Sequence, residues 1–176
     1  KRKSPIPPED ILKQGVAVKL KVNVDFHERY GLKLIIEDID SSFTMGQLEM
    51  QRQAILKAIQ ERGLIRKNAE TQLPVVVQRL AVISSDRAAG YKDFIKHLED
   101  NFYGYDIRID LFEAAMQGQQ VENEISACLD KVEKTMSDYD AVAIIRGGGG
   151  RTDLAAFDNL NLAVRIARFP IPVLIG

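Results

Sequence analysis

Residues 139–154 read Y-D-A-V-A-I-I-R-G-G-G-G-R-T-D-L, and this stretch decides the interpretation of the chain. A short apolar run ends at Arg146, and four consecutive glycines follow it. Because glycine costs about 0.5–1 kcal/mol relative to alanine inside a helix or strand, four in a row indicate a place where the backbone must bend or be approached closely. The pattern predicts a buried strand over residues 140–146, a glycine loop, and a helix from about Asp153 to Arg168.

The same alternation of strand and helix continues on both sides of this stretch. Apolar or alternating runs predict strands at 79–85, 105–112 and 171–176, and apolar stripes at helical spacing predict helices at 87–101 and 118–136. This order is typical of an α/β domain with a parallel four-stranded sheet, helices on both faces and right-handed crossovers. Ligands of such sheets bind outside the carboxyl ends of the strands, and this is where the glycine loop is predicted to lie.

The upstream part follows a different pattern. Residues 16–26 and 32–39 alternate apolar and polar side chains, which predicts a half-buried antiparallel hairpin. Two strands by themselves are marginal in water, so the hairpin either rests on the main domain or belongs to a larger β domain. A helix is predicted over residues 44–63, with Thr44 as its N-cap and Gly63 near its end.

We therefore divide the chain into a β-hairpin part (1–43), a linking helix (44–73) and the α/β domain (74–176). The chain does not begin with methionine and it ends on a strand pattern, so we interpret it as part of a longer protein whose α/β domain continues after Gly176.

Composition narrows the class of protein. The 176 residues are 45% apolar and 28% charged, as in soluble globular proteins. The net charge is −1, so a polyanionic ligand requires a local basic cluster. The single cysteine, Cys128, excludes an internal disulfide and fits a cytoplasmic protein. No apolar run approaches the roughly 20 residues of a membrane span and no signal peptide is present, so no membrane association is expected.

The glycine loop is a candidate phosphate site. Backbone N–H groups at a helix N-terminus bind anions, and the guanidinium groups of Arg146 and Arg151 on either side suit phosphate oxygens. The alternative is a flexible turn that lets the next helix pack closely on the sheet. The motif is neither a P-loop nor a dinucleotide fingerprint. Besides Arg146, the candidate residues are Gly147, Gly148, Gly149, Gly150, Arg151 and Asp153.

Further polar residues follow the first two predicted strands of the domain, namely Ser84, Ser85, Arg87, Gln117 and Gly118. Their position predicts that they lie at the same edge of the sheet as the glycine loop. Helix capping is an alternative for each group, because Ser85 or Asp86 fits the N-cap of one helix, and Gln117 with Gly118 fits the start of the next.

The remaining chemical groups favour structural roles. Helical spacing places Asp93 opposite the apolar stripe of its helix, which is typical of a solvated surface carboxylate. His27 and His97 have no partner at metal-ligand spacing, and Cys128 lies on an apolar helix face. No dense carboxylate cluster for a divalent metal is present.

In combination these motifs resemble the large subunit of exodeoxyribonuclease VII. L-A-V-I-S-S-D-R-A-A-G-Y-K-D-F (80–94) is similar to that family's GVITSxTGAAxxD segment, and D-A-V-A-I-I-R-G-G-G-G-R-T-D-L-A-A-F-D (140–158) to its DVxxxxRGGGSxEDLxxFN segment. A-M-Q-G (115–118) resembles the xxQG turn, P-I-P-V-L-I-G (170–176) the IPVxxxxG segment, and the hairpin the last strands of the family's OB-fold. The departures are Arg87-Ala88 for Thr-Gly, Gly150 for Ser, and Arg151-Thr152 for a pair that ends in Glu.

The resemblance implies a function and residues for it. It implies exonucleolytic hydrolysis of single-stranded DNA to short oligonucleotides, with Asp93 and Arg146 as catalytic residues and no requirement for a divalent metal. It also implies a small-subunit partner that binds a region absent here, and a histidine and a second aspartate just after Gly176, so residues 1–176 by themselves are expected to be folded and inert. The alternatives are a kinase-like nucleotide-phosphate site, which would want an aspartate at Gly149, and a non-catalytic phosphate-binding module.

Overall fold

The computed structural model describes residues 11–12, 16–148 and 154–176 of the chain. The chain divides into two compact units, Lys1–Gln53 and Ala54–Gly176. The division falls inside helix α2 (Ser41–Glu61), so this helix contributes its first part to one unit and its last part to the other.

The first unit contains the predicted antiparallel hairpin. Strands β1 (Leu20–His27) and β2 (Gly31–Ile39) pair along their length, and Gly31 enters β2 with a positive φ of 73°. The predicted half-burial is wrong, because the apolar side chains between Leu20 and Ile39, the outer ends of the two strands, are exposed. Alternation indicates only which side chains share a face, and a two-stranded ribbon supplies no second layer to cover that face. The exposed side chains are Val22, Val24, Phe26, Leu32, Leu34, Ile35 and Ile36.

Helix α2 begins earlier than the sequence indicated. Asp40, which precedes the helix, accepts a hydrogen bond from the N–H of Phe43 at 3.1 Å, and this bond holds the pKa of Asp40 below its usual range. Asp40 therefore fills the capping role predicted for Thr44. Thr44 instead lies in the first turn of the helix. Its side chain is buried, and its hydroxyl donates to the carbonyl of Ala17 at 3.0 Å.

The end of α2 matches the prediction. Gly63 has a positive φ of 65°, and its N–H donates to the carbonyl of Gln60 at 2.9 Å. The N–H of Leu64 donates to the carbonyl of Ile59 at 3.0 Å, and both of these side chains are buried. This pair of bonds is the Schellman arrangement that commonly ends helices.

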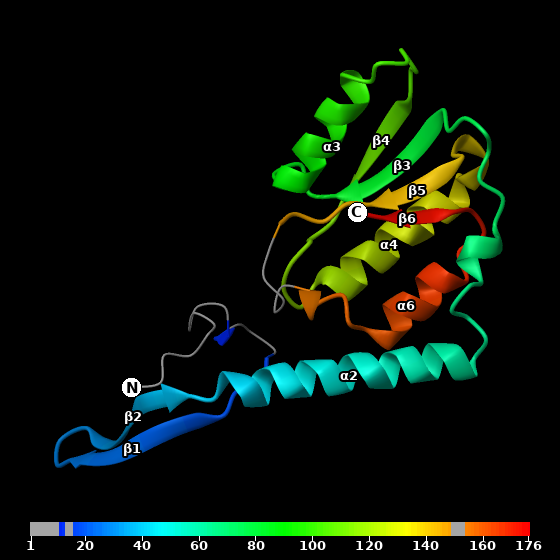
Figure 1. Cartoon of the computed structure of the whole chain (residues 1–176). Coiled ribbons are helices and arrows are strands. Elements are labelled where there is room, and N and C mark those ends of the chain that lie inside the picture. The colour runs from blue at the N-terminus through cyan, green and yellow to red at the C-terminus, as the bar shows by residue number, and fades with distance from the viewer. Residues whose placement is uncertain (1–10, 13–15, 149–153) are drawn as a thin grey trace. The chain divides into compact units, whose positions relative to one another are not determined.

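The second unit is the predicted α/β domain. Its four strands are parallel and lie in the order β4-β3-β5-β6. Figure 1 shows α3 on one side of the sheet and α4 and α6 on the other, which confirms the predicted architecture. The elements are β3 (Arg79–Ser84), α3 (Ala89–Glu99), β4 (Arg108–Glu113), α4 (Val121–Lys134), β5 (Ala141–Ile144), α6 (Leu160–Ala167) and β6 (Val173–Ile175), with short 3₁₀ helices at Asn68–Glu70 and Met136–Asp138.

The core lies on both faces of the sheet, and the two central strands form most of it. Every residue of β5 is buried, as is every residue of β3 after Arg79. This near-continuous burial is typical of parallel strands that are covered on both sides. On the α3 side the buried residues are Leu80, Val82, Ala141, Ala143 and Ile145, and on the α4 and α6 side they include Ala81, Ile83, Ile125, Leu129, Val142, Ile144, Leu162 and Phe169.

One amide side chain fixes the connection between α6 and β6. The Asn68 side chain donates to the carbonyls of Phe169 and Ile171, both at 3.0 Å, and accepts from the N–H of Val173 at 2.8 Å. These bonds satisfy backbone groups at the start of an edge strand, where a further strand would otherwise pair.

Candidate active site

The strand order places the carboxyl ends of β3 and β5 side by side at a switch point of the sheet. From β3 the chain crosses through α3 to β4 on one side, whereas from β5 it crosses through α6 to β6 on the other. Ligands of open α/β sheets bind at such a point. Ser84 ends β3 and Arg146 follows β5 by two residues, so residues that are far apart in the sequence meet here.

Ser84 links the two central strands. Its side chain is fully buried, and its hydroxyl donates to the carbonyl of Ile145 at 2.5 Å. The N–H of Ile145 donates to the carbonyl of Ile83 at 3.0 Å and so continues the ladder between the strands. The structure therefore gives this hydroxyl a partner inside the protein, whereas the sequence placed it among the phosphate-binding residues.

Arg146 combines a fixed backbone with a side chain that has no ion-pair partner among the described residues. It is half-buried, and its N–H donates to the carbonyl of Gly176 at 3.2 Å. Within the described residues its guanidinium forms no ion pair, unlike Arg79, which is bonded to Asp140. A guanidinium held at the end of a strand and free of carboxylates is a planar fork that suits a phosphate.

Gly90 supports the backbone of Arg146 from the other side, and the sequence analysis missed this role. A Cβ added at Gly90 would lie closer than 3.0 Å to the carbonyl oxygen of Arg146, and Gly147 lies beside Ala88. The first turn of α3 therefore rests directly on the chain at the start of the glycine loop. The sequence does contain a sign of this role, because Gly90 falls in the first turn of a predicted helix. Glycine is less favourable than alanine by about 1 kcal/mol in a helix, so a packing reason for it could have been expected.

Ser85 and Arg87 lie at the carboxyl edge, as predicted. They line a cavity of about 510 Å³ near the ends of β3 and β4. Three of its lining residues are carboxylates, Asp86, Glu113 and Glu124, and the Arg87 side chain is 93% exposed. Because these carboxylates oppose an anion, the cavity by itself gives little support to the phosphate-binding role of Ser85 and Arg87, which stays a prediction.

The N-cap predicted for α3 is wrong. The capping position is held by Ala88, which has no side chain to accept a hydrogen bond. The Ser85 hydroxyl instead accepts from the N–H of Arg87 at 3.3 Å, inside the turn that precedes the helix. Packing of Ala88 and Gly90 against the segment at Arg146 requires small residues at this helix start, and this outweighs the preference for a polar cap.

Gln117 and Gly118 also lie in the connection at the carboxyl edge, between β4 and α4. Both are exposed, and Gly118 has a positive φ of 83°. They do not begin the helix, because α4 starts at Val121 after Gln120, which forms no side-chain cap. The nearby loop is held instead by Glu124, whose carboxylate accepts from the N–H of Ala115 at 2.7 Å.

Asp93 is exposed on α3, as its helical spacing predicted. Its backbone carbonyl lies 2.7 Å from Nδ1 of His97, one turn further along the helix. Helix α3 begins at Ala89, five residues after β3 ends at Ser84, so Asp93 lies about one turn into the helix. The catalytic role that the resemblance implies for Asp93 stays a prediction.

Gly149, Gly150, Arg151 and Asp153 lie outside the described residues. Gly147 and Gly148 are described, and Gly148 is exposed. The helix predicted from Asp153 to Arg168 is shorter in the structure, because α6 starts at Leu160. Its cap is Asn159, whose side chain accepts from the N–H groups of Asn161 and Leu162, so a capping residue just before α6 decides where this helix begins.

Other candidate chemistry is sparse in the described part of the chain. In residues 11–12, 16–148 and 154–176, no group of three or more His, Cys, Asp or Glu residues is arranged to hold a metal ion. Cys128 is buried, its thiol donates to the carbonyl of Glu113 at 3.3 Å, and burial raises its pKa. Among the same residues no helix is long and apolar enough to cross a membrane.

Comparison with known proteins agrees with the resemblance read from the motifs. The exodeoxyribonuclease 7 large subunits of Deinococcus radiodurans and Campylobacter hominis are each 29% identical to this chain, over 94% and 93% of it respectively. That of Campylobacter jejuni strain RM1221 is 30% identical over 73% of the chain. The chain spans 40%, 41% and 33% of the length of these relatives. The family described as exonuclease VII, large subunit, matches residues 64–176, and the chain therefore belongs to this family.

Proposed function

We propose that this chain forms part of an exodeoxyribonuclease that hydrolyses single-stranded DNA from its ends to short oligonucleotides in the cytoplasm. Family membership supports this proposal, and one structural observation carries it. Arg146 lies at the switch point of a parallel sheet, where its N–H is bonded to the carbonyl of Gly176 and its own carbonyl packs against Gly90. Its guanidinium has no carboxylate partner among the described residues. Because the chain spans 40% of the relative from Deinococcus, the activity is proposed for the full-length protein.

In this proposal Arg146 binds the scissile phosphate. Its two parallel N–H donors match the geometry of phosphate oxygens, and they stabilise the charge that grows on these oxygens as the bond to the leaving oxygen breaks. Gly148 is exposed, and in this proposal its N–H adds a second donor. Asp93 would position a reacting group or transfer a proton, together with residues outside this chain. We further propose that no divalent metal is required, as the resemblance implies.

The hairpin unit would contribute to binding of the single strand. OB-folds, which the hairpin sequence resembles, bind single strands by stacking bases on aromatic rings beside basic groups. Phe26 is 69% exposed and Tyr30 is 76% exposed, and the guanidinium carbon of Arg29 lies 5.9 Å from the ring centroid of Tyr30. We also propose a small-subunit partner, which would bind a region outside this chain.

Substitution of Arg146 tests the proposal in the full-length protein with its small subunit. Arg146→Lys keeps the charge but loses the fork, so cleavage of end-labelled single-stranded DNA should fall by about 10²–10³-fold, with little change in the melting temperature. Arg146→Ala should lose at least as much activity. Asp93→Asn should lower the cleavage rate to a similar extent if that carboxylate is catalytic. It should leave the cleavage rate unchanged if Asp93 is only a surface group.

Arg62→Lys is the matched control, because Arg62 is exposed just after the end of α2 and its substitution should leave the rate unchanged. Cleavage should persist in excess chelator. A wild-type complex that does not cleave single-stranded DNA would contradict the proposed function, and near-normal cleavage by Arg146→Ala would remove this arginine from the mechanism.

A further inference from the structure

The segment between α3 and β4 combines aromatic and acidic residues. Residues 98–107 read L-E-D-N-F-Y-G-Y-D-I, with three carboxylates, three aromatic rings and neither lysine nor arginine. Since α3 leads from the carboxyl end of β3 to the amino end of β4, this segment lies at the opposite edge of the sheet from Arg146. The proposed function makes no use of it.

The aromatic rings of this segment face solvent and touch one another. Phe102 is 95% exposed, Tyr103 79% and Tyr105 52%. The ring centroids of Phe102 and Tyr103 are 5.7 Å apart, and those of Tyr103 and Tyr105 are 6.0 Å apart. Single exposed apolar residues need no explanation, but a contiguous set of this kind is typical of an interaction site.

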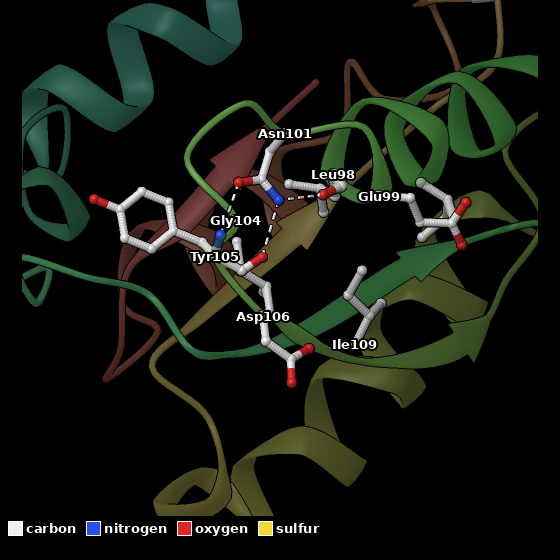
Figure 2. Close-up of a pocket in the computed structure, with 9 residues that line it drawn as sticks. Leu98, Glu99, Asn101, Gly104, Tyr105, Asp106 and Ile109 are labelled. Atoms are coloured by element: carbon white, nitrogen blue, oxygen red, sulfur yellow. Dashed lines mark hydrogen bonds between the residues drawn. The ribbon is translucent and has the colours of Figure 1, made fainter.

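The segment is held in a defined conformation. Figure 2 shows the side chain of Asn101 inside the loop, where it donates to the carbonyls of Leu98 at 2.7 Å and Tyr105 at 2.9 Å. Its oxygen accepts from the N–H of Tyr105 at 2.8 Å. Gly104 supplies the positive φ of 67° that the turn requires. The aromatic side chains are therefore displayed by a closed loop with satisfied backbone groups, which reduces the entropy lost when a partner binds.

A cavity of about 430 Å³ lies beside the segment, with Tyr105 as the one aromatic residue of its lining. Tyr105 is part of its lining together with apolar side chains, and Glu99 and Asp106 add carboxylates, as Figure 2 shows. The apolar side chains of the lining are Ile95, Leu98, Ile107 and Ile109. The cavity therefore has the size and composition to receive an aliphatic side chain that has a positive charge beside it.

The charge of the segment selects among possible partners. Glu99, Asp100 and Asp106 form no ion pair with any described residue, and the nearby Arg108 is bonded to Asp110 at 3.1 Å. Unpaired carboxylates repel a phosphate backbone, which disfavours single-stranded DNA despite the stacking rings. They attract lysine and arginine, and aromatic faces bind guanidinium groups as well.

We propose that residues 98–107 form a docking surface for a protein partner that presents an aliphatic residue flanked by arginine or lysine. The aliphatic side chain enters the cavity, and the cationic groups lie over the tyrosine rings and against the carboxylates of Glu99 and Asp106. The partner thus binds at the edge of the sheet that is remote from Arg146.

The test uses isotope-labelled chain and NMR titration. The probe is a blocked decapeptide of alternating arginine and leucine, compared with its glutamate–leucine counterpart and with a 20-nucleotide oligo-dT. The cationic peptide should shift the backbone amides of residues 99–106 in a saturable manner and should bind more weakly as salt is added. Phe102→Ser combined with Tyr103→Ser should weaken binding by at least about tenfold, as should Glu99→Gln combined with Asp106→Asn.

Met50→Ser is the control, since Met50 is an exposed apolar residue of α2 that belongs to neither proposed binding surface, and its loss should leave the affinity unchanged. The proposal is overturned if the cationic peptide leaves residues 99–106 unperturbed at millimolar concentration, or if the glutamate peptide binds equally well. It is also overturned if oligo-dT shifts these amides more strongly than the cationic peptide does. Dimerisation of the chain through this segment, measured by sedimentation, would overturn it as well.

Discussion

At the residue scale, Gly90 shows how one missing Cβ positions the chain at Arg146. Alanine in a helix is ordinarily more favourable than glycine by about 1 kcal/mol. At Gly90, however, the added Cβ would collide with a backbone carbonyl of Arg146, and a carbonyl can yield only if the strand end moves. We therefore expect Gly90→Ala to destabilise the protein by about 1–3 kcal/mol in urea unfolding.

Gly46→Ala is the matched control at this scale. Gly46 also lies in a helix and has nothing within 4 Å of an added Cβ, so its substitution should be neutral or stabilising. Equal effects of the two substitutions on stability would show that the start of α3 does not pack tightly against Arg146.

In the full-length complex, Gly90→Ala should also lower the cleavage rate more than it weakens binding of single-stranded DNA, because it displaces the backbone of Arg146 while leaving its charge in place.

At the element scale, Asp140 joins the amino ends of β3 and β5. One carboxylate oxygen accepts from the N–H groups of Gln78 at 2.8 Å and Arg79 at 2.9 Å, and the other accepts from the Arg79 guanidinium at 3.1 Å. The N–H of Gln78, followed by the N–H and guanidinium of Arg79, holds the pKa of Asp140 below its usual range. The ionised form is therefore favoured by folding.

The pH dependence of Asp140→Asn follows from the sign of this shift. Because the pKa in the folded protein is lower than in the unfolded chain, the stabilisation is complete above the unfolded value of about 3.9 and is lost as the pH falls through the folded value. We expect Asp140→Asn to lower the free energy of unfolding by about 1–2 kcal/mol at pH 7. We expect this difference between the variant and the wild type to disappear in acid. Denaturant unfolding between pH 2 and 8 measures this, with the exposed Asp138→Asn as control; a gap that does not depend on pH would contradict the assignment.

At the scale of the whole molecule, the two units differ in how much apolar surface they bury. The hairpin exposes side chains such as Phe26 and Leu32, whereas β3 and β5 are buried in the core of the second unit. A two-stranded hairpin is marginal in water, so its backbone should open often. We expect the amides of β1 and β2 to exchange with deuterium at least about 100-fold faster than those of β3 and β5, as measured by mass spectrometry. Equal protection of the hairpin would show that its exposed apolar face is covered in solution.

The local parts of this structure could be predicted because they depend on neighbouring residues. The apolar runs at 79–85 and 140–146 gave the two central strands, and the helical stripe beginning at Val121 gave α4. Helix starts were less predictable, since Asp40, Ala88 and Gln120 precede helices where the sequence favoured other residues. A cap contributes about 1 kcal/mol, which packing at the helix start easily outweighs.

The sequence by itself determined the parallel α/β architecture, the family motifs and the position of Arg146 after a strand. Only the tertiary structure decided the strand order that makes this position a switch point, because that order depends on pairing between distant segments. It also decided that Ser84 bonds the carbonyl of Ile145, 61 residues away, and that Gly90 packs against Arg146. These contacts join residues that no local periodicity relates, and burial in a close-packed core fixes them.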